Sequence, residues 1–253
     1  QIVGLAPDDL DAQMDLSIAM VRCGDTTYDL GDSDAGASWH RRAMERDRAI
    51  LERAPNNVRA ISNLAWSYHR LGARAISNRE LNAAEELLNR GLVLMETLTR
   101  IRGSVDDVRG LADMYTQLGY MAAARGDTAS QRRYHEASRN AAASAQSMAP
   151  ENRLAGQQWL RSKINCLWET GEDEAGRPSG EAWPLLLDEM RRFVQRDPSD
   201  RDSQVLMMVA YNNALLDAGR MLDSGAMTRL ESMLEADLAT VLTRLIRLDR
   251  LDI

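Results

Sequence analysis

The chain has 253 residues, a formal net charge of −7, and 44 % hydrophobic against 27 % charged residues. This acidic balance excludes a general nucleic-acid binder, which needs a basic face to displace counterions from phosphates. No apolar run approaches the roughly 18–20 residues needed to span a bilayer, so membrane insertion is not expected either. A single Phe and six Pro, among many Ala, Leu, Arg, Met and Glu residues, favour helices over strands.

A repeated pattern organises the whole chain. Five marks, spaced about 48 residues apart, each open a polar stretch that can start a helix. These marks are Pro7, Pro55, Gly103, Pro150 and Pro198. A period of this length is typical of stacked helix hairpins, so the sequence predicts an all-α fold. The repeats cover about 7–54, 55–102, 103–149, 150–197 and 198–253, and they are expected to form a single domain over 1–253.

Each repeat is predicted to hold two antiparallel helices. In the first repeat, Asp8 or Asp9 can cap a helix that runs to about Leu30. The second helix is expected to end before Pro55, because the residue before a proline disfavours helix. The polar, glycine-rich stretch 171–180 predicts a long loop inside the fourth repeat and no domain boundary. The other helices are expected near 57–78, 80–102, 105–125, 128–148, 151–170, 180–196, 200–222 and 226–250.

Two stretches of the second repeat resemble a known family. The segment NLAWSYHRLG at 63–72 resembles the first helix of a tetratricopeptide repeat, and ELNAAEELLNRGLVL at 80–94 resembles the second helix. The resemblance implies a TPR-like α-solenoid of five antiparallel helix hairpins, about ten helices, that binds a protein or peptide. The usual repeat has about 34 residues, so each helix is expected to be about two turns longer here.

Long repeats of this kind look similar to those appended to bacterial signalling proteins, including some protein kinases. No kinase motif is present, so any catalytic activity is expected to lie outside this chain. The chain begins with Gln1 and not Met, which favours a piece of a longer protein. We therefore interpret it as a non-catalytic protein- or peptide-binding scaffold or sensor domain of a larger bacterial signalling protein, with the cytoplasm as its expected compartment.

Aligning the repeats places residues in columns. One column is mostly small and predicts that neighbouring helices approach closely. It holds Ala19, Ser67, Met114, Ser162 and Ala210. The next column holds Tyr68, Tyr115 and Tyr211, which are expected in the core with a hydroxyl at its edge. Cys23 and Cys166 share a column with leucines and an alanine, so both are expected to be buried packing residues without a disulfide.

Two further columns of the first helices are mostly polar and lie seven residues apart, on one helical face. We predict that they line a concave groove, where arginine can hold a carboxylate and asparagine can engage a peptide backbone. The alternative is a plain solvated face. The predicted binding residues are Arg22, Asn63, Arg70, Gln117, Gln158, Asn165 and Asn213.

The sequence predicts no catalytic residue, no cofactor and no metal site. His40 and His135 lie two repeats apart, too far to share a zinc ion, and we interpret them as packing residues at repeat interfaces. There is no glycine-rich phosphate loop, HExxH or GxSxG motif. An α/α-barrel hydrolase is a distant alternative, because such barrels display aromatic grooves and aromatic residues are only 5 % of this chain.

The last predicted helix is unusually apolar for the end of a helical repeat array. Three explanations remain open for residues 226–253. The helix can be clasped by its own repeat, it can form a homodimer with a second copy, or a native capping element can follow it. A homo-oligomerisation module that uses this helix is therefore the second functional prediction.

Overall fold

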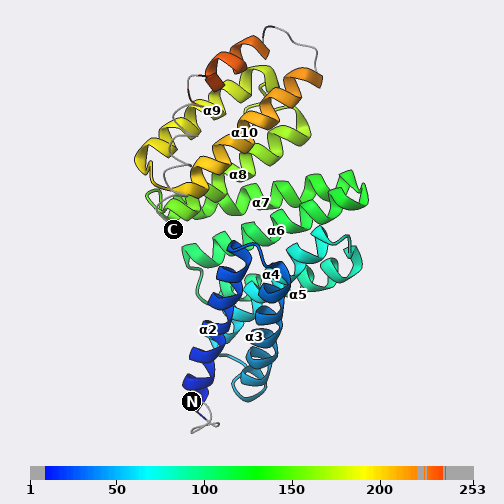
Figure 1. Ribbon diagram of the computed structural model, residues 1–253, viewed down its shortest axis with the longest axis vertical. Coiled ribbons are helices and arrows are strands. Elements are labelled where there is room, and N and C mark those ends of the chain that lie inside the picture. The colour runs from blue at the N-terminus through cyan, green and yellow to red at the C-terminus, as the bar shows by residue number, and fades with distance from the viewer. Residues whose placement is uncertain (1–8, 221–224, 226, 236, 238–253) are drawn as a thin grey trace. The chain divides into compact units, whose positions relative to one another are not determined.

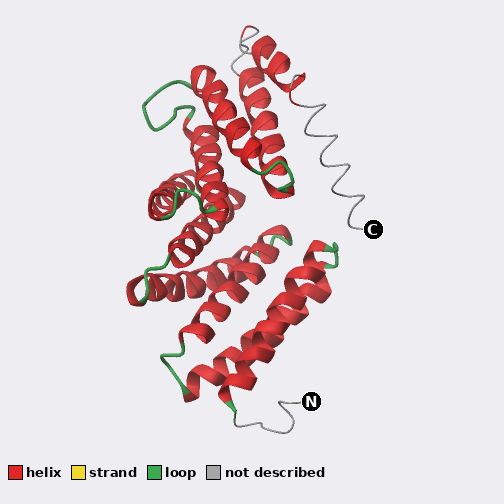
Figure 2. Ribbon diagram, turned by 90° about the vertical axis from the view of Figure 1, so that its left-hand side faces the viewer, coloured by secondary structure: helices red, strands yellow, loops and turns green. Residues whose placement is uncertain are grey.

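The computed structural model describes residues 9–220, 225, 227–235 and 237, and regular secondary structure in these residues is helical (Figures 1 and 2). The exception is one isolated antiparallel β-bridge between Glu172 and Pro178, inside the predicted loop. The expected all-α fold is thus confirmed. None of the described helices combines the length and the apolar character needed to cross a bilayer.

Contacts between Cα atoms divide the chain into two compact units, Gln1–Met148 and Ala149–Ile253. The first unit contains three antiparallel helix hairpins, one for each of the first three predicted repeats. Their helices are α2 (Leu10–Asp29), α3 (Ser33–Arg53), α4 (Val58–Ser77), α5 (Leu81–Ile101), α6 (Val105–Arg125) and α7 (Thr128–Met148). These bounds lie within a few residues of the predicted ones, because proline, glycine and capping residues mark the helix ends in the sequence.

The hairpins of the first unit stack in the manner of a TPR-like α-solenoid. Within each hairpin the two helices pack against one another, as α2 does with α3. The first helix of the next hairpin then packs against both helices of the hairpin before it, so that α4 contacts α2 and α3, and α6 contacts α4 and α5. The first helices α2, α4 and α6 therefore form one layer of the unit.

The second unit contains α8 (Arg153–Thr170), α9 (Ser179–Arg196) and α10 (Arg201–Arg220), which all contact one another. Residues 227–235 are also helical, within the predicted helix 226–250. Residues 226, 236 and 238–253 of that prediction lie outside the described residues. The core of this unit is built around Trp183, Tyr211 and Met207, and Leu230 of the 227–235 helix belongs to it.

Side-chain caps fix where the helices begin. Asp9, of the two predicted candidates, accepts hydrogen bonds from the backbone of Asp11 and Ala12 at the start of α2. Asn57 caps α4 in the same way, and Ser104 forms a capping box with Asp107 at the start of α6. Each cap satisfies backbone N–H groups that have no partner inside the helix, which explains the agreement with the predicted starts.

A glycine column sets the distance between the two helices of each hairpin in the first unit. A Cβ atom added at Gly119 would lie 2.1 Å from Nε2 of His135, and one at Gly24 would lie 2.7 Å from Nε2 of His40. Gly72 faces Leu88 in the same way. The interpretation of the two histidines as repeat-interface residues was wrong. Both are buried inside a hairpin, because the glycine opposite leaves room for the imidazole ring.

Candidate protein-binding surface

The predicted polar residues of the first unit lie largely along the contact between consecutive first helices. Nε of Arg70 on α4 lies 2.8 Å from Oδ1 of Asp25 on α2, and Nδ2 of Asn63 lies 3.6 Å from Sδ of Met14 on α2. Arg22 is exposed on α2, whereas Gln117 is half-buried on α6. Arg70 and Asn63 thus join two repeats, and Arg22 presents its side chain to solvent.

In the second unit the predicted residues are less accessible. Gln158 on α8 is only 3 % exposed, and Asn165 and Asn213 are half-buried. Among the seven predicted contacts, Arg22 and Arg70 are therefore the two with exposed side chains. Whether these residues form a binding groove stays a prediction.

The tyrosine column marks the contact of each first helix with the hairpin before it. Nη2 of Arg48 on α3 donates a hydrogen bond of 2.7 Å to the hydroxyl of Tyr68 on α4. The hydroxyl of Tyr115 on α6 donates to Glu96 on α5 at 3.4 Å. The hydroxyl of each tyrosine reaches a charged partner on the preceding hairpin, and the guanidinium carbon of Arg48 also lies 5.6 Å from the Tyr68 ring centroid.

The first hairpin has the same surface, but no described residues of an earlier hairpin cover it. In the small column, Ser67, Met114 and Ala210 are buried, whereas Ala19 on α2 is exposed. One turn further on, Leu71, Leu118 and Ala214 are buried, whereas Cys23 is exposed. We call the surface formed by the exposed Ala19 and Cys23, the half-buried Leu16 and the largely buried Met20 on α2, with Arg42 and Arg46 on α3, the end face.

The prediction that both cysteines are buried was therefore wrong for Cys23. Cys166 is buried, as expected from its column, and neither cysteine forms a disulfide. The alignment gave Cys23 the same column as Leu71, whose neighbours include Arg41 and Met44 of the preceding helix α3. Position in the column was right, but burial also needs a preceding hairpin, and the described residues contain none before α2.

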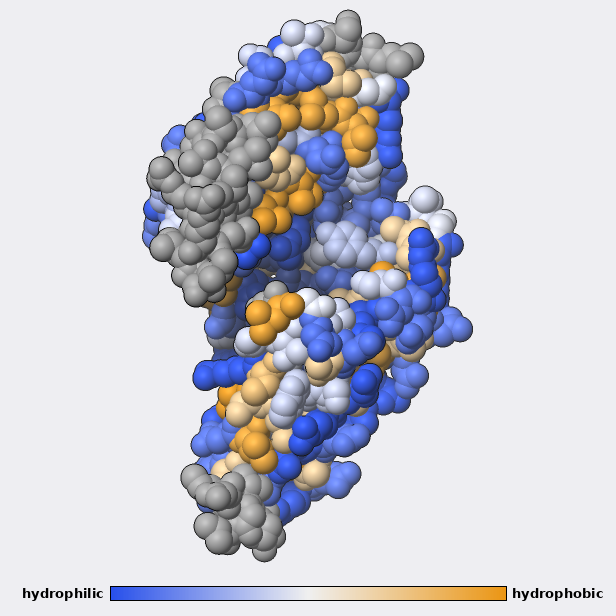
Figure 3. Space-filling view, in the orientation of Figure 1, coloured by the Kyte–Doolittle hydropathy of each residue, from blue (hydrophilic) through white to orange (hydrophobic). Residues whose placement is uncertain are grey.

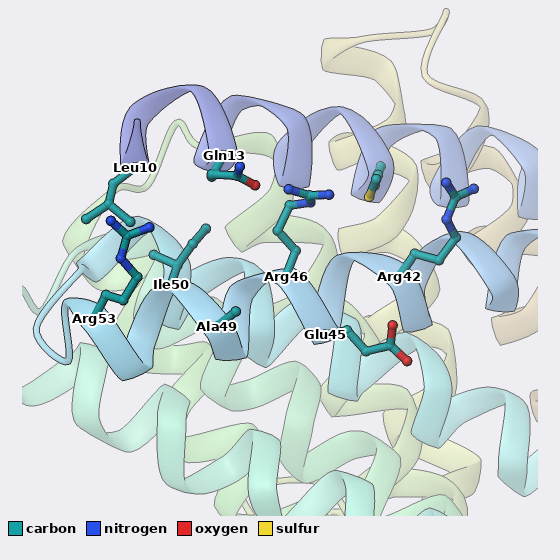
Figure 4. Close-up of a pocket in the computed structure, with 9 residues that line it drawn as sticks. Leu10, Gln13, Arg42, Glu45, Arg46, Ala49, Ile50 and Arg53 are labelled. Carbon is teal, nitrogen blue, oxygen red and sulfur yellow. The ribbon is translucent and has the colours of Figure 1, made fainter. Parts of the chain in front are cut away.

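A pocket of about 420 Å³ lies at the edge of the end face, between α2 and α3 (Figure 4). Its apolar wall consists of Leu10, Met20 and Ile50. The other lining residues are Gln13, Arg42, Glu45, Arg46, Ala49 and Arg53. An apolar wall beside a few charged groups is typical of a surface that binds an amphipathic ligand.

The charge of this pocket is one-sided. Figure 4 shows the guanidinium groups of Arg42, Arg46 and Arg53 on the side of α2, whereas the Glu45 carboxylate points away from it. Arg42 lies 4.7 Å above the Trp39 ring centroid, which holds its side chain in place. Nε of Arg46 is buried and has no hydrogen-bond partner among the described residues. Three arginines and one glutamate thus line the pocket, in a chain whose net charge is −7.

The sequence carries a signal for this pocket in the way the first repeat departs from the others. The repeats align Arg46 with Leu94 and Arg53 with Ile101, so the first repeat has arginines where the second has apolar residues. Met20 likewise stands where three other repeats have tyrosine. Comparing the first repeat with the others, column by column, would have singled out its second helix.

A second exposed apolar surface follows α10 (Figure 3). Val205, Val209 and Leu216 share one face of this helix and are 46 %, 44 % and 51 % exposed. In the preceding repeat two of the three corresponding positions contact α10 or the residue before it. Gln157 corresponds to Val205 and donates a hydrogen bond of 2.7 Å to Asp200. Trp168 corresponds to Leu216, and the guanidinium group of Arg220 lies 4.0 Å from its ring centroid. The apolar face of α10 thus repeats an interface that α8 makes with α10.

Comparison with known proteins gives a similarity to solved structures. No protein-family model matches the chain, and no curated protein matches it. Among solved structures, the chain is similar to the crystal structure of a thermophilic TPR protein in Thermus thermophilus. The two share 18 % sequence identity over 86 % of this chain and 98 % of that chain, with a TM-score of 0.49.

Proposed function

We propose that this chain is a non-catalytic protein-binding scaffold and that the end face of its first hairpin is a binding surface. One observation carries the proposal: positions that are buried under a preceding hairpin in later repeats are exposed at Ala19 and Cys23. A partner helix that covered this face would bury apolar surface of α2, and burial of apolar surface is the main favourable term in association. Arg22 lies three residues after Ala19, on the neighbouring part of the helix surface, and borders the same face.

Cys23 gives a direct test of this proposal. Peptides selected on the full chain from a phage-displayed library of helical peptides should slow the alkylation of Cys23 by iodoacetamide, because a bound helix covers the thiol. Cys166 is the internal control, since it is already buried and should keep its rate. Selected peptides that bind tightly but leave the Cys23 rate unchanged would place the binding surface elsewhere.

A substitution pair separates this surface from the rest of the chain. Ala19→Arg puts a long charged side chain on the end face and should abolish binding of the selected peptides. Ala123→Arg is the matched control, because Ala123 is also an exposed helical alanine, on α6. Equal loss of binding in both variants would indicate a general effect of charge or stability and would count against the end face.

The predicted polar columns and the bacterial signalling setting remain parts of this proposal. Arg22 and Arg70 support a groove along the first helices, because both side chains are exposed and carry charge. The resemblance of the long repeats to those of signalling proteins supports the setting. Replacing Arg70 and Asn165 together by alanine should weaken partner binding if the groove contributes, and unchanged affinity would remove these columns from the binding surface.

Self-association is a second candidate function, favoured by the exposed apolar face of α10. Val205, Val209 and Leu216 carry no charge, so two copies can approach there without repulsion. The homodimer predicted from residues 226–253 falls largely outside the described residues, and the α10 face lies next to it in the sequence. Light scattering should show a dimer that Val209→Arg converts to a monomer. Val93→Arg, at an exposed valine of α5, should leave the dimer intact, and a monomeric wild-type chain would exclude this function.

A further inference from the structure

We propose that the partner of the end face is an amphipathic helix with acidic side chains, seated where the second helix of a preceding hairpin would lie. This inference rests on the proposed function and adds the chemistry of the ligand. The internal contacts of the first unit supply the geometry, since α3 packs on α4 and α5 packs on α6 in this way. The end face continues the same type of interface on α2.

The second repeat shows what an incoming helix meets at this position. The Tyr68 hydroxyl receives a hydrogen bond from Arg48 of the preceding helix α3, and Arg90 of its own hairpin also interacts with this tyrosine. In the first repeat, Met20 takes the place of Tyr68 and Arg42 takes the place of Arg90. A helix seated on the end face would therefore place its side chains beside Met20 and Arg42.

The third repeat shows that an acidic side chain fits this position. Glu96 of α5 lies at the place of Arg48 in the repeat alignment, and it accepts a hydrogen bond from the Tyr115 hydroxyl of α6. On the end face an equivalent glutamate would lie beside the guanidinium group of Arg42. Hydrogen bonds between a guanidinium and a carboxylate are about twice as strong as neutral ones, so the acidic residue would be favoured over its amide.

The charge of the pocket favours an acidic helix over a second copy of this chain as the occupant of the end face. Arg42 and Arg46 both line the pocket, and a carboxylate on an incoming helix would offset their positive charge. A two-fold contact between end faces of two copies would bring Arg42 and Arg46 toward the same residues of the other copy, and like charges repel. The apolar wall of Leu10, Met20 and Ile50 requires an apolar face on the same ligand. An acidic amphipathic helix meets these requirements together.

Two matched probes test the inference. Both are 21-residue peptides with the sequence of α5, a helix whose apolar face packs on a first helix in this protein. The acidic probe carries Arg90→Gln and Arg100→Gln, which leaves three glutamates and no basic residue. The basic probe carries Glu85→Gln, Glu86→Gln and Glu96→Gln, which leaves two arginines. The apolar residues of the two probes are identical, so only charge differs.

Titration calorimetry of the full chain with each probe should show that the acidic probe binds at least about tenfold tighter, a difference of roughly 1.4 kcal/mol. The preference should shrink at high salt, because the charges lie near the surface. In the double variant Arg42→Glu with Arg46→Glu, the preference should reverse in favour of the basic probe. This reversal also shows that the variant is folded. The control variant Arg132→Glu with Arg133→Glu, two exposed arginines of α7, should keep the wild-type preference.

The outcomes separate this inference from the proposed function. If both probes bind equally and protect Cys23, the end face binds helices but does not select acidic ones, and this inference is overturned while the proposed function stands. If neither these probes nor the library peptides protect Cys23, the proposed function itself fails. If Cys23 becomes protected with rising concentration of the chain alone, the occupant is a second copy and the acidic partner is overturned.

Discussion

Asp47 is a buried carboxyl group in the first hairpin, at a position that is apolar in the other repeats. The repeat alignment places Met95, Ala142 and Met190 in the same column. Asp47 has no solvent exposure, and burial raises its pKa to about 7, although Ser17 and Arg46 each pull the pKa down. Because burial penalises the charged form, the folded hairpin favours the protonated carboxyl group.

This residue predicts how stability depends on pH. The Asp47 carboxyl group binds its proton more tightly in the folded state than in the unfolded chain. The contribution of this group to the free energy of unfolding is therefore complete below pH 4 and is lost as the pH rises to about 7. Asp47→Met should remove this pH dependence and stabilise the chain at pH 8 by roughly 2–4 kcal/mol. Urea unfolding at pH 5 and pH 8 measures both effects. Asp106→Asn is the control, because Asp106 is exposed. If Asp47→Met raised the free energy of unfolding at pH 8 by no more than Asp106→Asn does, the effect assigned to burial of Asp47 would be contradicted.

The burial of single side chains was harder to predict from the sequence than the positions of the helices. The column of Cys23 predicts a small buried residue, and Cys166 follows that prediction, but Cys23 is exposed. The polar column likewise predicts Gln158 at a groove, although its side chain is buried. A column gives the direction in which a side chain points along the repeat. It cannot say whether another hairpin lies in that direction, which is a property of the neighbouring repeats.

At the scale of helices, the sequence predicted boundaries better than contacts. The caps Asp9, Asn57 and Ser104 act on the backbone a few residues away, so their effect depends on local sequence alone. The close approach of α6 and α7 depends on the pair Gly119 and His135, which are far apart along the chain. Such a pair becomes visible only when the two helices are placed side by side.

The contact between Gly119 and His135 predicts a large effect of one methyl group. Gly119→Ala should destabilise the chain by about 1–3 kcal/mol, because its Cβ would lie 2.1 Å from the imidazole Nε2 and the buried ring must move. Gly219→Ala is the matched control, since its nearest neighbour would be 3.5 Å away. That change should be neutral or stabilise by up to about 1 kcal/mol through helix propensity. Thermal unfolding of the two variants compares them, and equal midpoints would contradict the packing described for this hairpin.

At the scale of the whole chain, the period of about 48 residues predicted the fold class and the order of hairpins. It worked because each hairpin buries its apolar side against its neighbours, so the same pattern recurs. We further propose that 1–253 behaves as a single domain, as the unbroken register of the repeats suggests. Calorimetry should then show one cooperative thermal transition, and two separate transitions would contradict this proposal.

The central claim is that a partner helix covers the end face of the first hairpin, and the alkylation rate of Cys23 tests it most directly. With the acidic probe at about ten times its dissociation constant, the Cys23 rate should fall about tenfold, since only the free chain then reacts. The rate at Cys166 should stay the same, because that thiol is buried with or without the probe. Tight binding of the probe with no change at Cys23 would contradict the claim.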